Sequence, residues 1–256
     1  MKKAFLCMFT LILGVLIMGG TPSTVYAMEE VQTPKLIDSV NNREVSEMNE
    51  MLDNVKHFTP EIVSEIEKYS DISIKKLDDN NVQIIISNRI PERIDYFQDG
   101  TQEEFYTINS YFGTLNNPTP GNTGISPSDL DVKVRIEAYY SIYEVGPAKI
   151  PHYRLISGVG GILNCWENGY RNLVITPKVR GTYENPNGSG GSTGLLTYPR
   201  TIACPTIGTL YSKATNNSNY YNSADSYSWV KVDVKVEWRH GENWGNYSNF
   251  SLSLFN

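Results

Sequence analysis

The second half of the chain alternates apolar and polar residues with a period of two. From Val132 to Ile142 every even position is apolar or aromatic, whereas charged residues such as Arg135 stand between them. The same alternation returns from Val230 to Trp238 and, after a turn at residues 240–243, from Phe250 to Leu254. Because successive side chains of a strand point to opposite faces, we expect one face on a core and the other in water. The pattern predicts an all-β domain, an antiparallel β-sandwich or small barrel, closed by a long hairpin.

Shorter strands are expected between these ends, at Tyr153–Val159, Leu173–Arg180 and Thr206–Ser212. Segments rich in glycine, asparagine and serine separate them, at Gly181–Gly194 and Ala214–Ser228. Such residues favour turns, so both segments are predicted to be loops.

The first half follows a helical period. Apolar residues recur at three-and-four spacing between Arg43 and Lys56, with acidic residues on the remaining surface, which predicts a helix over this range. Thr59 and Pro60 then form a typical helix start, because the hydroxyl caps free amides and proline suits the first turn. An apolar stripe up to Tyr69 predicts a second, short helix.

A hairpin and a third helix complete the expected α+β region. The β-branched runs around Ile72 and at Val82–Ile86 are separated by Asp and Asn residues that favour a turn, so they predict a hairpin. Phe105, Ile108 and Phe112 have the spacing of one helical face and predict a third helix.

The N-terminus has the pattern of a secretory signal peptide. Lys2 and Lys3 precede an apolar run, and small residues at Val25 and Ala27 suit cleavage after residue 27. The chain is therefore expected to be secreted and extracellular. The overall composition, with 40% hydrophobic and 20% charged residues among 256, is that of a globular protein.

Charge divides the chain in two. Residues 28–128 carry 18 acidic and 8 basic side chains, whereas residues 129–256 carry 10 and 12. Residues 116–128 hold three prolines and two glycines and predict a linker between an acidic region at 28–115 and the all-β domain at 129–256. The acidic region would also suit a prosegment. The net charge of −6 argues against nucleic acid as a partner and does not favour an anionic membrane.

Two cysteines remain after signal cleavage. Cys165 and Cys204 would lie in an oxidising compartment, where a disulfide between them is expected. Two buried thiols are the alternative.

No catalytic or metal-binding arrangement is recognisable. Gly190–Gly194 matches the G-x-S-x-G pattern of serine hydrolases, but it lacks the preceding apolar strand and the following helix, so we interpret it as a glycine loop. The three histidines do not have metal-ligand spacing, and the Glu103–Glu104 pair is interpreted as a solvated helix surface. We predict neither a cofactor nor a metal, and a hydrolase assembled from distant residues stays open.

The main functional indication is an aromatic, asparagine-rich stretch near the C-terminus. Binding loops use tyrosine, tryptophan, serine and asparagine because rigid rings provide contact area and short polar groups adapt to a partner. The candidate ligand-binding residues are Tyr220, Tyr221, Tyr227, Trp229 and Trp244.

Three segments of the β half resemble a loose group of small secreted proteins of Gram-positive bacteria. They are Ile136–Ile142, Tyr153–Gly161 and the terminal run VKVDVKVEWRHGENW. The resemblance implies secretion and an all-β second half, and it supplies no activity.

The sequence therefore predicts a secreted, non-enzymatic protein whose aromatic β domain binds an extracellular glycan, wall or protein surface. The alternative is a membrane-active toxin or antimicrobial protein, because Val132–Ile142 and Val230–Trp238 reach the length of transmembrane β-strands.

Overall fold

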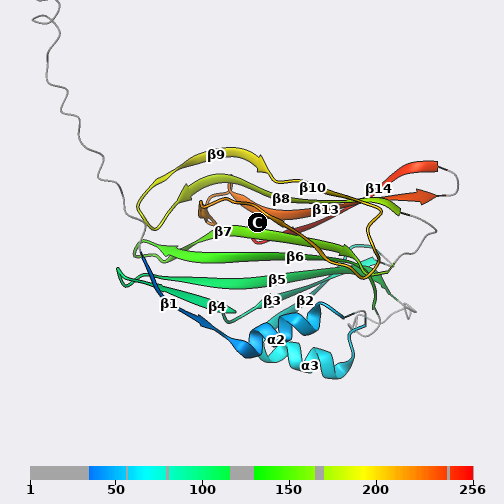
Figure 1. The fold of residues 1–256 in the computed structure, drawn as a ribbon, viewed down its shortest axis with the longest axis horizontal. Coiled ribbons are helices and arrows are strands. Elements are labelled where there is room, and N and C mark those ends of the chain that lie inside the picture. Colours follow the sequence, from blue (N-terminus) through cyan, green and yellow to red (C-terminus); the bar gives the residue numbers. More distant parts are fainter. Residues whose placement is uncertain are drawn as a thin grey trace, which may run out of the picture. The chain divides into compact units, whose positions relative to one another are not determined.

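The computed structural model describes residues 35–55, 57–78, 81–115, 130–164, 170–240 and 243–255. Most of them form antiparallel strands, and two helices, α2 (Arg43–Leu52) and α3 (Pro60–Tyr69), pack beside the strands (Figure 1). The signal peptide and the linker, two predictions from the sequence, lie outside the described residues.

All strands belong to one curled sheet. The strands are β1 (Leu36–Asn41), β2 (Ser70–Lys76), β3 (Asn81–Asn88), β4 (Arg93–Phe97), β5 (Gln102–Leu115), β6 (Leu130–Val145), β7 (Ile150–Ile162), β8 (Tyr170–Glu184), β9 (Gly190–Thr197), β10 (Arg200–Ala203), β11 (Tyr211–Ala214), β12 (Tyr221–Asn222), β13 (Trp229–His240) and β14 (Asn243–Ser253). Their main order is β1-β4-β5-β6-β7-β12-β8-β13-β14. Outside this order, β3 pairs with β5 and β2 pairs with β3. Strands β9 and β10 pair with β8, and β11 pairs with β7.

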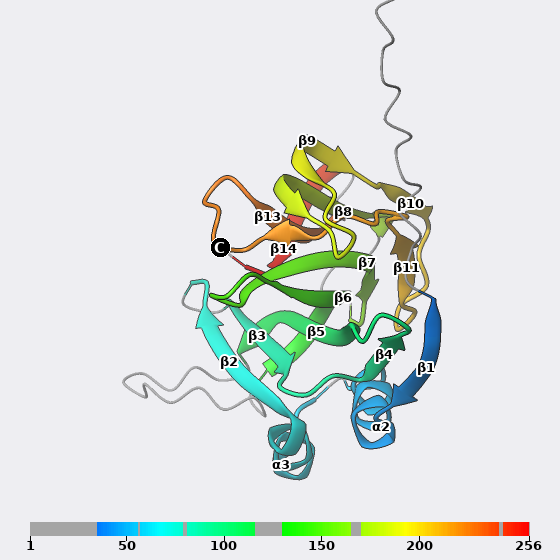
Figure 2. The ribbon, with the colours of Figure 1, turned by 90° about the vertical axis from the view of Figure 1, so that its left-hand side faces the viewer.

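The sheet folds over itself, so that β13 and β14 lie against β6 (Figure 2). The even positions from Val230 to Val236 are buried between the two layers, together with Ile136 and Ala138 of β6 and Leu173 and Ile175 of β8. This confirms the predicted β-sandwich-like, antiparallel architecture and the long terminal hairpin of β13 and β14.

Two glycines of β7 allow the layers to approach closely. A Cβ on Gly158 would lie 2.7 Å from Val232 Cγ1, and one on Gly160 would lie 2.7 Å from Val234 Cγ2. Both glycines lie within strand β7. Next to them, the register between β6 and β7 shifts between Tyr139 and Tyr140 of β6.

A second core lies between the helices and the other face of the sheet. Val45, Met48 and Leu52 of α2 pack with Ile84 and Ile86 of β3. Figure 2 shows α2 and α3 on the side of β2, β3 and β5, away from β8 and β13. The first two predicted helices and the β2–β3 hairpin are confirmed, and Thr59 caps α3 by accepting a bond from Ile62 N.

The predicted third helix is wrong, because its residues form strand β5. Ile108 and Phe112 face the core shared with β13 and β14, whereas Phe105 and Tyr111 are buried on the opposite face. Both faces of β5 are covered, so its apolar residues do not alternate simply. Glu103 consequently lies on a strand and pairs with Arg154 of β7.

The expectation that the odd positions of β6 face water is wrong at Arg135, whose side chain is fully buried beneath α2. The predicted loop at Gly181–Gly194 is also wrong: it is the β8–β9 hairpin, with its turn at residues 185–189. Only the end of Thr206–Ser212 is extended, in β11.

The two halves of the chain share the sheet. β5 and β6, which flank the predicted linker, are paired from Glu104↔Ile142 to Leu115↔Leu130. The described residues belong to one compact unit, Pro34–Asn256.

Candidate binding face

Two of the predicted ligand-binding residues are core residues. Tyr221 is fully buried in β12, where it pairs with Tyr153 of β7 and Tyr183 of β8. Its hydroxyl accepts a hydrogen bond from Asn217 Nδ2 at 3.0 Å. Strand β12 joins the two layers at one end, and this position turns the aromatic ring inward. Tyr221 is therefore not part of an exposed contact surface.

Tyr220 is buried as well, against β6 and β7. Its hydroxyl accepts a hydrogen bond from Ser141 Oγ at 3.3 Å, and the Arg154 guanidinium lies 5.2 Å from its ring centroid. Burial raises the pKa of the Tyr220 phenol. The prediction that Tyr220 contacts a ligand is corrected for the same reason.

Tyr227 and Trp229 lie on the outer face of the β8–β13 layer. Tyr227 is 45% exposed, and Trp229 is partly buried at the start of β13. Val230 of β13 points into the core, so its neighbour Trp229 points outward, as do Lys231 and Asp233. The side chain of Trp244 lies outside the described part of the molecule.

Each of the two outer rings is paired with a cation. The Arg180 guanidinium carbon lies 3.7 Å from the ring centroid of Tyr227, and Lys231 Nζ lies 5.1 Å from that of Trp229. Trp229 is opposite Arg180 in the β8–β13 register, which places the two stacks next to each other. Both stacks satisfy the geometry of cation–π attraction.

A short loop that is fixed by Asp225 holds Tyr227. The Asp225 carboxylate accepts hydrogen bonds from Tyr227 N at 2.9 Å, Ser228 Oγ at 2.9 Å and Thr182 Oγ1 at 2.7 Å. These bonds, led by that from the Tyr227 amide, lower the pKa of Asp225. The loop is thus tied to strand β8 beside Arg180.

Regular pairing with β13 positions Arg180. It stands opposite Trp229 in an unbroken stretch of the β8–β13 register, so both side chains lie on the outer face. The next residue, Gly181, has φ +121°, and a Cβ there would lie 2.4 Å from Ser228 Cα, which only glycine avoids. The neighbouring bulge belongs to β9, where two residues face Arg180 alone.

The face continues into a depression toward β14. A cavity of about 310 Å³ lies there. Lys178 Nζ is 2.5 Å from Asp233 Oδ2, and Ser251 Oγ donates to Asp233 Oδ1 at 2.7 Å. We call this set the aromatic–cation face: Tyr227, Arg180, Trp229, Lys231, Lys178, Asp233, Asn249 and Ser251.

A larger groove adjoins the face at the edge of β14. It has a volume of about 670 Å³ and shares Asn249, Phe250 and Ser251 with the depression. Phe112 lies in its wall, and Gln83 Nε2 donates to Ser251 O at 3.4 Å across it. The depression and the groove therefore share a wall formed by β14.

The residues predicted from the sequence include Tyr227 and Trp229 but not the cations beside them. The period of two in β13 could have placed Lys231 and Asp233 on the same face as Trp229. Arg180 and Lys178 belong to a strand about 50 positions away, and only the β8–β13 register brings them there.

The remaining candidates lie elsewhere. Cys204 is exposed with φ +47°, whereas Cys165 lies outside the described residues, so the disulfide stays a prediction. Ser192 of the G-x-S-x-G match lies in the exposed strand β9, not in a loop. His152 is buried, with Nδ1 3.0 Å from Ile150 O.

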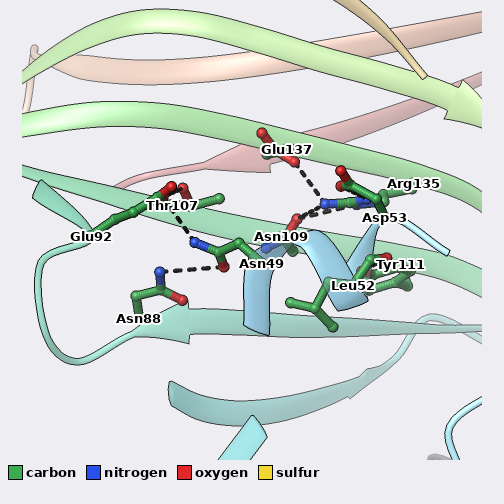
Figure 3. Close-up of polar contacts among 10 residues, drawn as sticks. All are labelled: Asn49, Leu52, Asp53, Asn88, Glu92, Thr107, Asn109, Tyr111, Arg135 and Glu137. Carbon is green, nitrogen blue, oxygen red and sulfur yellow. Dashed lines mark hydrogen bonds and ion pairs between the residues drawn. The ribbon is translucent and has the colours of Figure 1, made fainter. Parts of the chain in front are cut away.

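A second polar cluster lies under α2 (Figure 3). Arg135 Nη1 is 2.5 Å from Asp53 Oδ1, its Nη2 is 2.7 Å from Glu137 Oε2, and Asn109 Oδ1 accepts from Nε and Nη2 at 3.2 and 2.7 Å. Beside it, Tyr111 donates its hydroxyl to the carbonyl of α2 residue Leu52 at 3.0 Å. Burial raises the pKa of Glu137, and the Arg135 charge opposes this.

The cluster continues along the helix to Glu92. Its carboxylate accepts hydrogen bonds from Asn49 Nδ2 and Thr107 Oγ1, both at 2.9 Å, and Asn88 Nδ2 donates to Asn49 Oδ1 at 3.4 Å (Figure 3). Apart from Asn109 Nδ2, which has no hydrogen-bond partner among the described residues, these groups bond with one another and dock α2 on the sheet, so we assign them a structural role.

Comparison of the chain with protein-family models, curated proteins and solved structures gives no match. Among the described residues, no helix is both long and apolar enough to cross a membrane.

Proposed function

We propose that the chain is a secreted, non-enzymatic protein that binds an extracellular glycan through the aromatic–cation face. The proposal depends on one observation: the outward rings of Tyr227 and Trp229 stand beside a concave surface that carries hydrogen-bonding side chains. Secretion follows from the signal-peptide pattern of residues 1–27.

The chemistry of the face suits a sugar chain. A pyranose ring has an apolar face that stacks on an aromatic ring and hydroxyl groups at its edge. Trp229 offers the ring, while Asp233, Asn249 and Ser251 supply acceptors and donors within the same depression. The groove at the β14 edge shares residues of β14 with the depression, so an extended polymer could contact both.

The face is held in place before any ligand binds. Trp229 and Lys231 stand on a central strand, and Asp225 fixes the Tyr227 loop. Binding sites on rigid elements lose little conformational entropy when the ligand arrives, which favours affinity.

Retention of the purified protein on insoluble glycans tests the proposal. We expect the protein to be retained by at least one polymer in a panel of cell walls, chitin, and neutral and acidic polysaccharides. Trp229→Ala and Tyr227→Ala should each weaken retention by about tenfold, because aromatic anchors dominate binding energy. Tyr96→Ala, which changes a partly buried ring on the distant strand β4, is the control.

Equal retention of the wild type and of Trp229→Ala would contradict the proposal. Circular dichroism of each variant separates loss of binding from loss of fold.

A further inference from the structure

Among the described residues, none accepts a hydrogen bond from Arg180 on the aromatic–cation face. Its guanidinium lies on the exposed ring of Tyr227, and the β8–β13 register places it opposite Trp229. Its Nε is shielded from solvent, so a ligand would be bound through the two terminal nitrogens of the guanidinium. A guanidinium forms its strongest hydrogen bonds with anionic oxygens.

The other described arginines that lie over aromatic rings are different. Each of them lies against an oxygen of the protein. Arg93 forms an ion pair with Asp95, although its Nε, like that of Arg180, has no hydrogen bond; Arg135 pairs with Asp53 and Glu137, Arg154 pairs with Glu103, and Arg200 donates to Ser212 O. Within the described part of the chain no carboxylate pairs with Arg180. This contrast points to an acceptor that the protein itself does not supply.

The charge around Arg180 favours a ligand with a single negative charge. Lys231 also has no carboxylate partner among the described residues, and it lies on the Trp229 ring. Lys178 is neutralised by Asp233, and Asp225 supports the adjoining loop. Three cations and two carboxylates leave one net positive charge, which attracts a carboxylate and gives little support to a multiply charged group.

We propose that the glycan bound at this face carries carboxylate groups, and that Arg180, assisted by Lys231, binds one of them. The Tyr227 and Trp229 rings then hold the neutral parts of the neighbouring sugars. This inference rests on the proposed function and adds the chemical class of the ligand. Arg180 is the specificity-determining residue, and the aromatic rings supply contact area.

Dextran and carboxymethyl-dextran of equal length form the matched pair of ligands. They share one backbone and differ in the carboxylates, so isothermal titration of the wild-type protein with each isolates the effect of charge. We expect carboxymethyl-dextran to bind at least about tenfold more tightly, with the difference shrinking as salt is added.

Three variants assign the charge recognition to Arg180. Arg180→Gln should remove the preference for carboxymethyl-dextran. Arg180→Lys retains the charge but lacks the planar fork of the guanidinium, so it should recover only part of the preference. Arg200→Gln changes an arginine that also lies near a ring, Tyr211 at 5.9 Å, but already donates to a carbonyl, and it should bind like the wild type.

The outcomes separate this inference from the proposed function. Equal affinity for the two polymers, lost in Trp229→Ala but kept in Arg180→Gln, would overturn the carboxylate assignment and leave the glycan-binding face intact. Binding of neither polymer would overturn the assignment too. So would binding to phosphatidylglycerol vesicles in place of carboxymethyl-dextran, since the anion would then belong to a membrane.

Discussion

Arg135 carries a positive charge in the interior of the molecule, where charge is costly to desolvate. Its guanidinium is enclosed by Asp53, Glu137 and Asn109 under helix α2. Two carboxylates and an amide oxygen compensate the desolvation through bonds in good geometry. The residue therefore fixes how the end of α2 meets the sheet.

Replacing Arg135 with methionine should destabilise the fold strongly. The change removes the cation and leaves the Glu137 carboxylate, which is only 19% exposed, without its partner; breaking a fully buried pair costs about 3–5 kcal/mol, so the loss should lie near the lower end of this range. Urea unfolding followed by circular dichroism measures the effect. Asp53→Asn is the matched control: Asp53 is half exposed, so its loss should cost less than about 1 kcal/mol. Equal effects of the two changes would mean that Arg135 is not held as described.

Asp225 gives the aromatic–cation face a defined pH dependence. Hydrogen bonds from Tyr227, Thr182 and Ser228 lower its pKa below the ordinary value of 3.8. A carboxyl whose pKa is lower in the folded state stabilises that state above its unfolded pKa and loses this effect as pH falls through the folded value. The Tyr227 loop should therefore be fully held at neutral pH and loosen only in strong acid.

The variant Asp225→Asn tests this sign. It should be less stable than the wild type at neutral pH, and the difference in free energy of unfolding should shrink as pH falls below about 4. Urea titrations at a series of pH values measure it. A difference that stays constant down to strong acid would show that the ionised carboxylate does not hold the loop.

Strand β7 owes its position to two glycines that face β13. Alanine at Gly158 or Gly160 would place a methyl group 2.7 Å from a buried valine carbon, so the layers would have to move apart. Overpacking of this kind costs about 1–3 kcal/mol. Gly158→Ala and Gly160→Ala should therefore lower the midpoint of urea unfolding.

Gly194→Ala in the exposed strand β9 is the control for these changes. An added Cβ there meets no atom within 4 Å, so stability should change by less than about 0.5 kcal/mol. If Gly158→Ala were as stable as Gly194→Ala, the close approach of the two layers would be wrong.

The elements that sequence pattern predicted correctly are those with one buried face. Val45 and Leu52 mark a helix with one apolar stripe, and β13 alternates because only its Val230–Val236 side is covered. Strand β5 was predicted as a helix because both of its faces are covered, which hides the period of two. Arg135 was placed in water for a related reason, since no local pattern shows that α2 lies above it.

The sheet crosses the boundary that composition suggests between the two halves of the chain. β6 is paired with β5 along its length, and Ile108 and Phe112 of β5 belong to the same core as Val134 and Ile136. Residues before 116 thus complete the sandwich formed by residues after 129.

Expression of residues 129–256 alone tests this dependence. The fragment lacks β5 and α2, so one face of β6 and part of the main core would be exposed. We expect it to be aggregated or unfolded, with no cooperative thermal transition. A fragment with a cooperative transition and dispersed NMR signals would show that the β half is an independent domain.

At the scale of the molecule, sequence could indicate that aromatic residues near the C-terminus have a binding role, but not which of them are exposed. Tyr220 and Tyr221 are the same residue type as Tyr227, yet Tyr221 is buried between β7 and β8, and Tyr220 is buried against Ser141 of β6 and Arg154 of β7. Arg180 is brought near Tyr227 only by the long-range β8–β13 register. Neither the burial of the two tyrosines nor this register leaves a local pattern.

Hydroxyl-radical footprinting of the protein with and without carboxymethyl-dextran locates the ligand on the surface. Bound polymer should protect Tyr227 and Trp229 from oxidation, while Tyr96 of β4 should be oxidised equally in both states. Protection of Tyr96, with Tyr227 and Trp229 unchanged, would contradict the assignment of the aromatic–cation face as the binding site.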